Sequence, residues 1–254
     1  MDEWYLRSLA ALKDTFLGGN ESQVLAEAIL EHHRNQHMTL LDIGTGTGRS
    51  LIEIVGRLRV NGLSVDATAV DIFFSPDAAD RLKTHDILPL QIDFGKFASA
   101  AKFDVILATQ SLYYFADLHG ILGRMCELLS ATGVLCLTLW NEQCILRKVA
   151  IEVFGGEASM VLSPRLVLEY LEKNQRFRRL SSRAVVGPVA INQWIASEHV
   201  LRGAAIVLSR RLAPEVRQDE IERLRTVVEK LGGIENRSNS IIFAYREDGN
   251  IADR

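Results

Sequence analysis

The sequence has few cysteines, and those it has follow no recognisable pattern. Cys126, Cys136 and Cys144 are the three cysteines, and no two of them form a Cys-x-x-Cys pair. An odd and sparse set of cysteines argues against a disulfide framework and is typical of a reducing compartment. The amino terminus shows no apolar secretory segment either. We therefore expect a cytoplasmic protein without disulfides, and no motif predicts a bound metal.

An excess of basic residues and a long apolar run are also missing. The chain has 29 Lys and Arg against 32 Asp and Glu, which gives a formal net charge of −3. Nucleic-acid binders normally present a basic face, so we expect no nucleic-acid partner. No apolar run approaches the ~20 residues that span a bilayer, so we expect no membrane partner.

Short apolar runs alternate with amphipathic stretches between residues 38 and 140. Strands this apolar, separated by helices, indicate a parallel sheet that is covered on both faces. Ligands of such doubly wound α/β sheets bind at the carboxyl ends of the strands, where the strand order reverses. The predicted strands are Met38–Ile43, Ser64–Asp71, Ile87–Asp93, Phe103–Gln110 and Gly133–Trp140.

The predicted helices lie between these strands and in both flanks of the chain. Ser75 is placed to cap one of them, with Pro76 at its first position. Residues 2–35 predict two short helices interrupted at Leu17–Asn20, and Ser240–Tyr245 predicts a closing strand. The other predicted helices are Arg49–Val60, Pro76–Thr84, Asp117–Leu129, an amphipathic stretch that ends at Phe154, Pro164–Lys173, Asn192–Leu208 and Pro214–Leu231.

The segment LLDIGTGTGRS (Leu40–Ser50) places three glycines between a strand and a helix. Such a turn lets a ligand approach the backbone, and the helix start offers N–H groups to an anion or a nucleoside. The dinucleotide pattern G-x-G-x-x-G fits poorly, since the third glycine, Gly48, comes one position early, but NAD stays an alternative. A Walker phosphate loop is excluded, because no Gly-Lys-Ser/Thr follows.

The spacing DIGTGTG after a strand-ending acid resembles the first motif of the class I S-adenosylmethionine-dependent methyltransferases. The resemblance implies a seven-stranded, mostly parallel, Rossmann-like sheet and S-adenosylmethionine as the cofactor. It places Asp71 on the ribose hydroxyls, Asp93 near the adenine amino group and Asp42 near the methionine ammonium. The cofactor-binding residues that it implies are Asp42, Gly44, Thr45, Gly46, Gly48, Asp71, Ile72, Asp93, Phe94 and Thr109.

The segment TQSLYYF after the fourth strand resembles the Gln-x-x-Tyr-Tyr part of the histamine N-methyltransferase family. The resemblance implies catalytic or acceptor-binding roles for Gln110, Tyr113 and Tyr114. It extends to Glu21, as a residue that binds an amine, and to Asn239 in the acceptor pocket. Structural roles stay open alternatives: a core ring for Tyr113, a helix cap for Glu21 and a turn bond for Asn239. The Asn/Asp-Pro-Pro-Tyr signature of other N-methyltransferases is absent.

The chain departs from that family after the fifth strand. Trp140, a further candidate acceptor-binding residue, ends the strand, but no tryptophan follows in the next stretch. Arg147 and Lys148 stand there instead and would favour an acceptor that carries a carboxylate. Trp194 is either a replacement wall of the pocket or a core residue.

Together these features predict a single methyltransferase domain over residues 1–254. Residues 1–36 would form a helical cap, 37–141 the cofactor-binding core and 142–254 the substrate-side helices and closing strands. We expect an enzyme, a monomer or homodimer, that methylates a nitrogen of a small molecule such as an amine, an imidazole or an amino acid. The alternatives are a small-molecule O-methyltransferase and a non-catalytic binding subunit.

Overall fold

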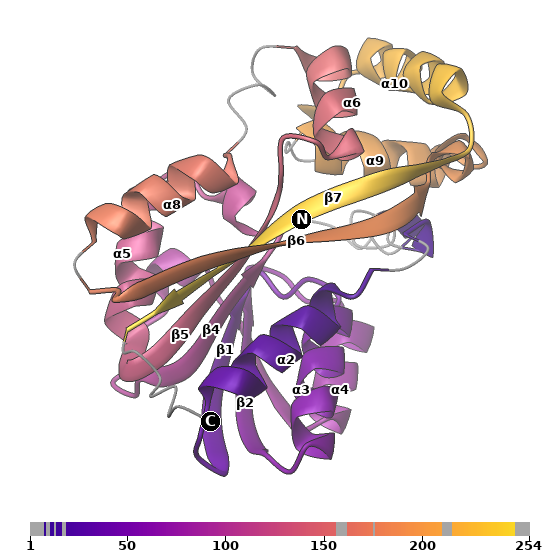
Figure 1. The fold of residues 1–254 in the computed structure, drawn as a ribbon. Coiled ribbons are helices and arrows are strands. Elements are labelled where there is room, and N and C mark those ends of the chain that lie inside the picture. The colour runs from indigo at the N-terminus through magenta and orange to yellow at the C-terminus, as the bar shows by residue number, and fades with distance from the viewer. Residues whose placement is uncertain are drawn as a thin grey trace. The chain divides into compact units, whose positions relative to one another are not determined.

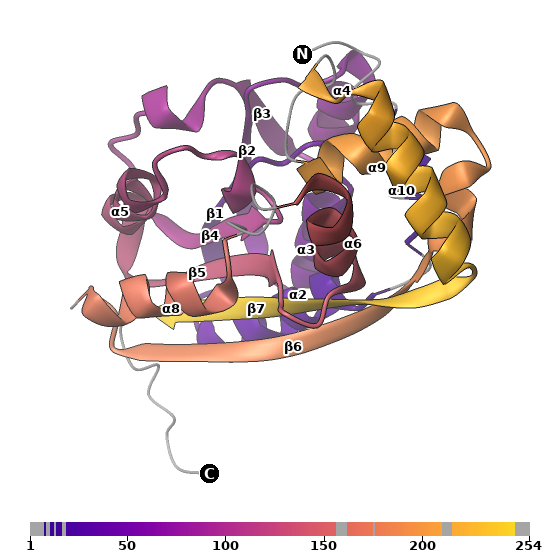
Figure 2. The same cartoon turned by 90° about the horizontal axis from the view of Figure 1, so that it is seen from above.

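The computed structural model describes residues 8, 11–12, 14–16, 19–155, 162–174, 176–209 and 215–246, which Figure 1 draws as a ribbon. Within these residues, seven strands form one mixed sheet in the order β3-β2-β1-β4-β5-β7-β6 (Figures 1 and 2). The first five strands pair in parallel, which confirms the predicted doubly wound sheet. The strands are β1 (His37–Ile43), β2 (Ser64–Asp71), β3 (Ile87–Gln91), β4 (Phe103–Thr109), β5 (Leu129–Trp140), β6 (Arg179–Ala190) and β7 (Ile234–Tyr245).

The chain divides into two compact units, which we name the sheet unit and the helical unit. The sheet unit comprises Glu21–Leu139, Pro164–Arg183 and Ser240–Arg254. The helical unit comprises Met1–Asn20, Trp140–Ser163 and Ala184–Asn239. The boundaries predicted at residues 36 and 141 stay predictions.

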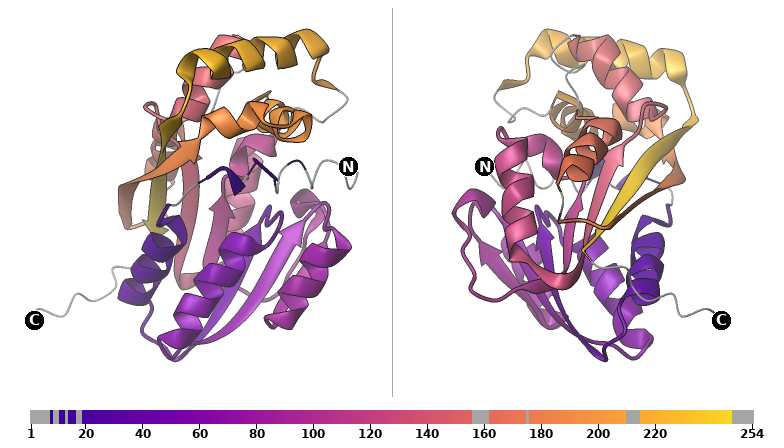
Figure 3. Two further views of the ribbon diagram at one scale, coloured as in Figure 1. Left: turned by 90° about the vertical axis from the view of Figure 1, so that its right-hand side faces the viewer. Right: turned by 60° about the vertical axis from the view of Figure 1, so that its left-hand side comes forward.

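In the sheet unit, helices cover both faces of the parallel strands. Helices α2, α3 and α4 lie on one face, and α5 and α8 lie on the other (Figures 1 and 3). Strand β1 is buried from Leu40 to Ile43, and β4 from Val105 to Ala108, which is the burial expected of a strand covered on both sides. The helices are α2 (Glu21–His32), α3 (Arg49–Val60), α4 (Pro76–Thr84), α5 (Leu118–Leu128) and α8 (Pro164–Lys173), with the 3-10 turns η1 (Phe94–Lys96) and η2 (Leu112–Tyr114).

Four described helical elements of the helical unit pack on one another: α6 (Ile145–Phe154), the 3-10 helix η3 (Ile191–Ile195), α9 (Glu198–Ser209) and α10 (Gln218–Leu231). No helix in the described part of the chain is long and apolar enough to cross a membrane.

The predicted helices agree with the structure where a clear start signal is present. Helix α4 begins at Pro76, and the Ser75 hydroxyl accepts a hydrogen bond from the Ala78 N–H at 3.1 Å. The single helix predicted over Asn192–Leu208 is wrong, because η3 and α9 are separate. Ser197 lies between them, and its hydroxyl accepts a hydrogen bond from the Val200 N–H at 3.2 Å and so starts a new helix.

Other predicted bounds shift, or fall on residues that the structure does not describe. Helix α10 begins at Gln218, whereas Pro214 lies outside the described residues. Strand β7 begins at Ile234, six residues before the predicted Ser240. Of the two helices predicted over residues 2–35, the first falls mostly outside the described residues, and the second is α2.

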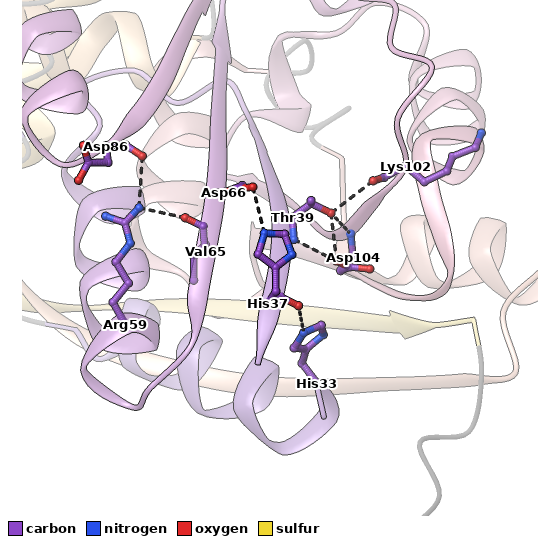
Figure 4. A network of polar contacts seen from close by, with 9 residues as sticks. All are labelled: His33, His37, Thr39, Arg59, Val65, Asp66, Asp86, Lys102 and Asp104. Atoms are coloured by element: carbon purple, nitrogen blue, oxygen red, sulfur yellow. Dashed lines mark hydrogen bonds and ion pairs between the residues drawn. The ribbon is translucent and has the colours of Figure 1, made fainter. Parts of the chain in front are cut away.

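The amino ends of the central strands are fastened by a polar network (Figure 4). The Asp104 carboxylate accepts hydrogen bonds from the Thr39 N–H and the Thr39 hydroxyl, both at 3.0 Å, which ties β4 to β1. His37 lies 3.0 Å from the Asp66 carboxylate, and Arg59 donates to the Val65 and Asp86 carbonyl oxygens. The polar side chains at this edge of the sheet therefore bind one another or the backbone.

Candidate active site

The glycine-rich loop lies at the opposite, carboxyl edge of the sheet, directly after β1. Gly44 has φ 72°, and a Cβ atom added there would lie 2.4 Å from the Ser111 Cβ. Gly48, with φ 77°, precedes α3, and its added Cβ would lie 2.9 Å from Leu82 Cδ2. A left-handed φ and this close approach both exclude a side chain at Gly44. The loop therefore presents bare backbone, as the sequence predicts.

Asp71 closes the loop from the end of β2. Its Oδ2 accepts a hydrogen bond from the Gly46 N–H at 2.8 Å, and its Oδ1 accepts one from the Phe73 N–H at 3.1 Å. Ile72, the next residue, is 54% exposed and leaves apolar surface beside this carboxylate. The structure thus brings an acid, a bare loop and an apolar side chain together at one strand end.

Asp42 and Thr45 lie at the same carboxyl edge of the sheet as Asp71. Asp42 is 5% exposed near the end of β1, and the Thr45 hydroxyl donates to the Asp42 carbonyl oxygen at 3.2 Å. The helix that follows, α3, starts at Gly48 with no side-chain cap. Its first N–H groups are not held by a capping side chain, which is the usual arrangement at an anion-binding helix start.

Asp93 and Phe94 are placed differently from the prediction. Strand β3 ends at Gln91, so Asp93 lies two residues beyond its end, is exposed, and caps η1 by accepting from the Gly95 N–H at 2.8 Å. The Phe94 ring is buried and packs against Phe97 and Phe115, with centroids 6.1 and 6.3 Å away. The cofactor contacts of these two residues stay predictions.

Gln110 follows β4 in an unusual conformation. Its φ is 58°, and its N–H donates to the Thr138 carbonyl oxygen at 3.0 Å. The Nε2 and Oε1 atoms of its side chain are buried, and no described residue forms a hydrogen bond with either. A non-glycine residue with positive φ is uncommon and is often found at a functional site.

Ser111 fastens this segment to the glycine-rich loop. Its hydroxyl donates to the Ile43 carbonyl oxygen at 2.6 Å, so the chain after β4 is held against the end of β1. Thr109, the last residue of β4, pairs in register with Thr138 of β5. Sequence reasoning missed Ser111 and Thr138, because each acquires its role from a strand that is distant along the chain.

The tyrosines and Glu21 also belong to the sheet unit. Tyr113 and Tyr114 form η2, where Tyr113 is half-buried and Tyr114 is 47% exposed. Glu21 is the first residue of α2 and is half-buried. This position is compatible with the helix-capping alternative as well as with amine binding, so the role of Glu21 stays a prediction.

Two further predicted residues, Trp140 and Asn239, lie in the helical unit. Both are buried, at the end of β5 and within β7 respectively, and their acceptor-binding roles stay predictions. Lys148 is exposed on α6, whereas Nη1 of Arg147 is buried. The fully buried Trp194 donates from Nε1 to the Thr15 hydroxyl at 3.0 Å, which makes it a core residue of this unit.

The cysteines supply no ionised thiol. All three are free and buried. Burial raises the pKa of Cys126 to about 11, and it raises the pKa of Cys136 and of Cys144 as well. Among the described residues, no group of three or more His, Cys, Asp or Glu is arranged to hold a metal ion.

Comparison with known proteins gives a family and a fold. A family model described as "methyltransferase domain" matches residues 18–194. The ubiquinone biosynthesis O-methyltransferase from Rhodopseudomonas palustris is 28% identical over 133 residues, which are 50% of this chain and 49% of that enzyme. The chain spans about half the length, or less, of the curated relatives that it matches.

Two solved structures share the architecture at low identity. YcgJ from Bacillus subtilis has a TM-score of 0.62 and 14% identity, with 89% of this chain and 99% of that chain covered. The N-methyltransferase NodS from Bradyrhizobium japonicum, solved with S-adenosylhomocysteine, has a TM-score of 0.51 and 15% identity, with 89% and 85% covered. The narrower resemblance to histamine N-methyltransferase is not shown by these matches.

The family match and the geometry of the loop lead to the same cofactor. S-adenosylmethionine, and not NAD, is the cofactor of this family, and neighbours of the same fold hold its product. Because the family model covers well over half of the chain, this protein belongs to the methyltransferase domain family.

Proposed function

We propose that the chain methylates a nitrogen atom of a small molecule by in-line displacement. The observation that carries the proposal is the buried amide of Gln110, which follows the carboxyl end of β4 and comes three residues before Tyr113 in the chain. An amide oxygen can accept an N–H hydrogen bond from the acceptor and so aim the nitrogen lone pair.

When bound, S-adenosylmethionine would supply a methyl group to the nitrogen lone pair, and the electron pair of the broken carbon–sulfur bond would stay on sulfur. The chain's own contribution is orientation and exclusion of water, and aligned reactants can gain ~7–11 kcal/mol from proximity. In the proposed arrangement Asp71 holds the ribose hydroxyls, Asp42 the methionine ammonium, and Ile72 packs on the adenine.

The remaining residues of the sheet unit would hold the acceptor. Tyr113 and Tyr114 present aromatic faces, which attract a cation by ~0.5–2 kcal/mol each, depending on desolvation. Glu21 would bind an ammonium or an N–H at the far end of the acceptor. A neutral nitrogen has a lone pair ready for attack, and the proton it carries can leave to water after transfer, so the reaction needs no strong base.

A second candidate is transfer to oxygen. The match to an O-methyltransferase over half of the chain favours this second candidate. The fold neighbour NodS, in contrast, is an N-methyltransferase. The two acceptors differ chemically, because a hydroxyl must lose its proton before or during attack, whereas a neutral amine or imidazole need not.

A substrate screen with S-adenosylmethionine labelled in its methyl group tests the proposal. The panel pairs amines and imidazoles with hydroxyl and carboxyl analogues of the same size, and mass spectrometry locates the label. We expect label on nitrogen. Label on oxygen alone would replace the proposal with the second candidate.

Glu21→Gln tests the acceptor side separately. It should raise KM for an amine acceptor and leave the affinity for S-adenosylhomocysteine unchanged. An unchanged KM would assign Glu21 to the helix cap instead.

A further inference from the structure

Three buried polar atoms without a hydrogen-bond partner lie at the carboxyl ends of β4 and β5. They are Nε2 and Oε1 of Gln110 and Oγ1 of Thr138, and no described residue forms a hydrogen bond with any of them. The two residues are adjacent, because the Gln110 N–H donates to the Thr138 carbonyl oxygen at 3.0 Å. Thr138 is fully buried.

Two threonine hydroxyls elsewhere in the sheet unit, those of Thr39 and Thr84, find partners within the chain. The Thr39 hydroxyl donates to the Asp104 carboxylate at 3.0 Å, and the Thr84 hydroxyl donates to the Asp80 carbonyl oxygen at 2.9 Å. The Thr47 hydroxyl has no partner among the described residues, and it lies in the glycine-rich loop. Among the described residues of this unit, the buried threonine hydroxyls without a partner are those of Thr47 and Thr138.

Buried side-chain atoms without a partner occur elsewhere in the unit as well, on His32, Arg124 and Arg179. Those of Gln110 and Thr138 differ from them because they belong to two residues that meet at neighbouring strand ends, and buried polar groups are normally paired.

The surroundings of Thr138 are apolar. Cys136, two residues earlier on β5, is buried. Cys136 points to the same face of the strand as Thr138, because side chains two residues apart share a face. Burial raises the pKa of the Cys136 thiol, which shows that this face disfavours a charge.

We infer that Gln110 and Thr138 together form the subsite for the reacting head group of the acceptor, and that this head group is uncharged and both donates and accepts hydrogen bonds. The inference rests on the proposed function, since it deepens the description of the same acceptor site. An ammonium only donates and would leave the Gln110 Nε2–H groups unpaired. A carboxylate only accepts and would leave Oε1 unpaired. A neutral amine, an imidazole, an amide or a hydroxyl satisfies both atoms.

The first test is the stability of Thr138→Val. If the hydroxyl has no partner in the free protein, its removal should raise the melting temperature by about 2–4 °C. The matched control is Thr39→Val, at the other edge of the sheet (Figure 4). It breaks the hydrogen bonds with Asp104 and should lower the melting temperature by a similar amount. A lower melting temperature for Thr138→Val would overturn the inference.

The second test is the binding of three probes of the same shape to the protein saturated with S-adenosylhomocysteine. Benzyl alcohol donates and accepts, benzylammonium only donates, and benzoate only accepts. Binding is followed through the signals of the probes in NMR titrations, which serve equally for variants that lack Gln110. We expect benzyl alcohol to bind at least about tenfold more tightly than either ion. Tighter binding of an ion, or no binding of the alcohol, would overturn the inference.

The variants connect the probe to the two residues. Thr138→Val and Gln110→Met should each weaken benzyl alcohol binding by roughly fivefold, the value of one neutral hydrogen bond. Thr39→Val should leave it unchanged, and no variant should alter the affinity for S-adenosylhomocysteine. Equal binding of the alcohol to the wild type and both site variants would refute the assignment. These measurements need no turnover, so a screen that finds methylation on oxygen alone would refute the nitrogen acceptor and leave the subsite standing.

Discussion

Replacing Gly44 with alanine gives the sharpest test of the cofactor loop. The residue has φ 72°, and the new Cβ would lie 2.4 Å from the Ser111 Cβ. A left-handed conformation costs a side chain on the order of 1–2 kcal/mol. Relief of the overlap by backbone shifts adds about 1–3 kcal/mol. We therefore expect Gly44→Ala to lower the free energy of unfolding by about 2–5 kcal/mol.

Two other glycines separate the two effects. Gly62 has φ 88° with open space around it, so Gly62→Ala carries the conformational cost alone, on the order of 1–2 kcal/mol. Gly56 lies inside α3 and also faces open space, so Gly56→Ala should stabilise the protein by up to about 1 kcal/mol. Adding Ser111→Gly to Gly44→Ala removes the overlapping Cβ atom and should restore part of the loss.

The assays are urea denaturation and calorimetric titration with S-adenosylhomocysteine. Gly44→Ala should weaken binding, because the loop backbone has to move away from Ser111, whereas Gly62→Ala and Gly56→Ala should leave affinity unchanged. If Gly44→Ala were as stable as Gly62→Ala and bound the ligand like the wild type, the argument from close backbone approach would be refuted.

Three further predictions concern single side chains. Asp71→Asn should weaken S-adenosylhomocysteine binding roughly 10–100-fold in calorimetry, since a hydrogen bond to a charged group contributes ~1.5–3 kcal/mol; an unchanged affinity would remove Asp71 from the ribose. Burial lowers the pKa of His32, so the native state favours the neutral ring, and stability should fall as the pH drops below the ordinary value of about 6.5. His32→Gln should flatten that dependence in urea midpoints measured from pH 5 to 8, and an identical slope would contradict the assignment. Asp86→Gly should change stability by no more than about 1 kcal/mol, because glycine accepts the positive φ, whereas Gln110→Gly also removes the unpaired amide and should raise the free energy of unfolding by about 1–3 kcal/mol; only Gln110→Gly should reduce methyl transfer in the screen.

Much of the fold could be predicted because its signals are local. The apolar runs of β1, β2 and β4 and the start signal at Ser75 depend on residues within a few positions of one another. The end of β3 was placed two residues too late, because Ile92 prolongs the apolar run. In the structure the Ile92 N–H still donates to the Asp71 carbonyl oxygen at 2.8 Å, and Asp93 then turns the chain by binding the Gly95 N–H.

The candidate site residues that the sequence predicts are those at or directly after the carboxyl end of a strand. The sequence alone predicts Asp71 and Gln110 as site residues, because a doubly wound sheet directs attention to the carboxyl ends of its strands. Ser111 and Thr138 were missed for the opposite reason. The hydroxyl of Ser111 binds the carbonyl oxygen of Ile43, which is 68 positions away. Thr138 lies in an apolar strand, and only the structure shows that its buried hydroxyl has no partner among the described residues. No local pattern carries either fact.

The backbone of Gln110 is itself an argument that its side chain is used. Within the described chain, Asp86 and Gln110 are the non-glycine residues with positive φ. Asp86 belongs to a turn at the other edge of the sheet, and aspartate tolerates this conformation comparatively well. Glutamine has no such tolerance, and glycine would satisfy the turn after β4 at lower cost. A strained residue with a buried and unbonded amide is doubly unfavourable in the free protein, and the proposed acceptor would offset this cost by pairing the amide.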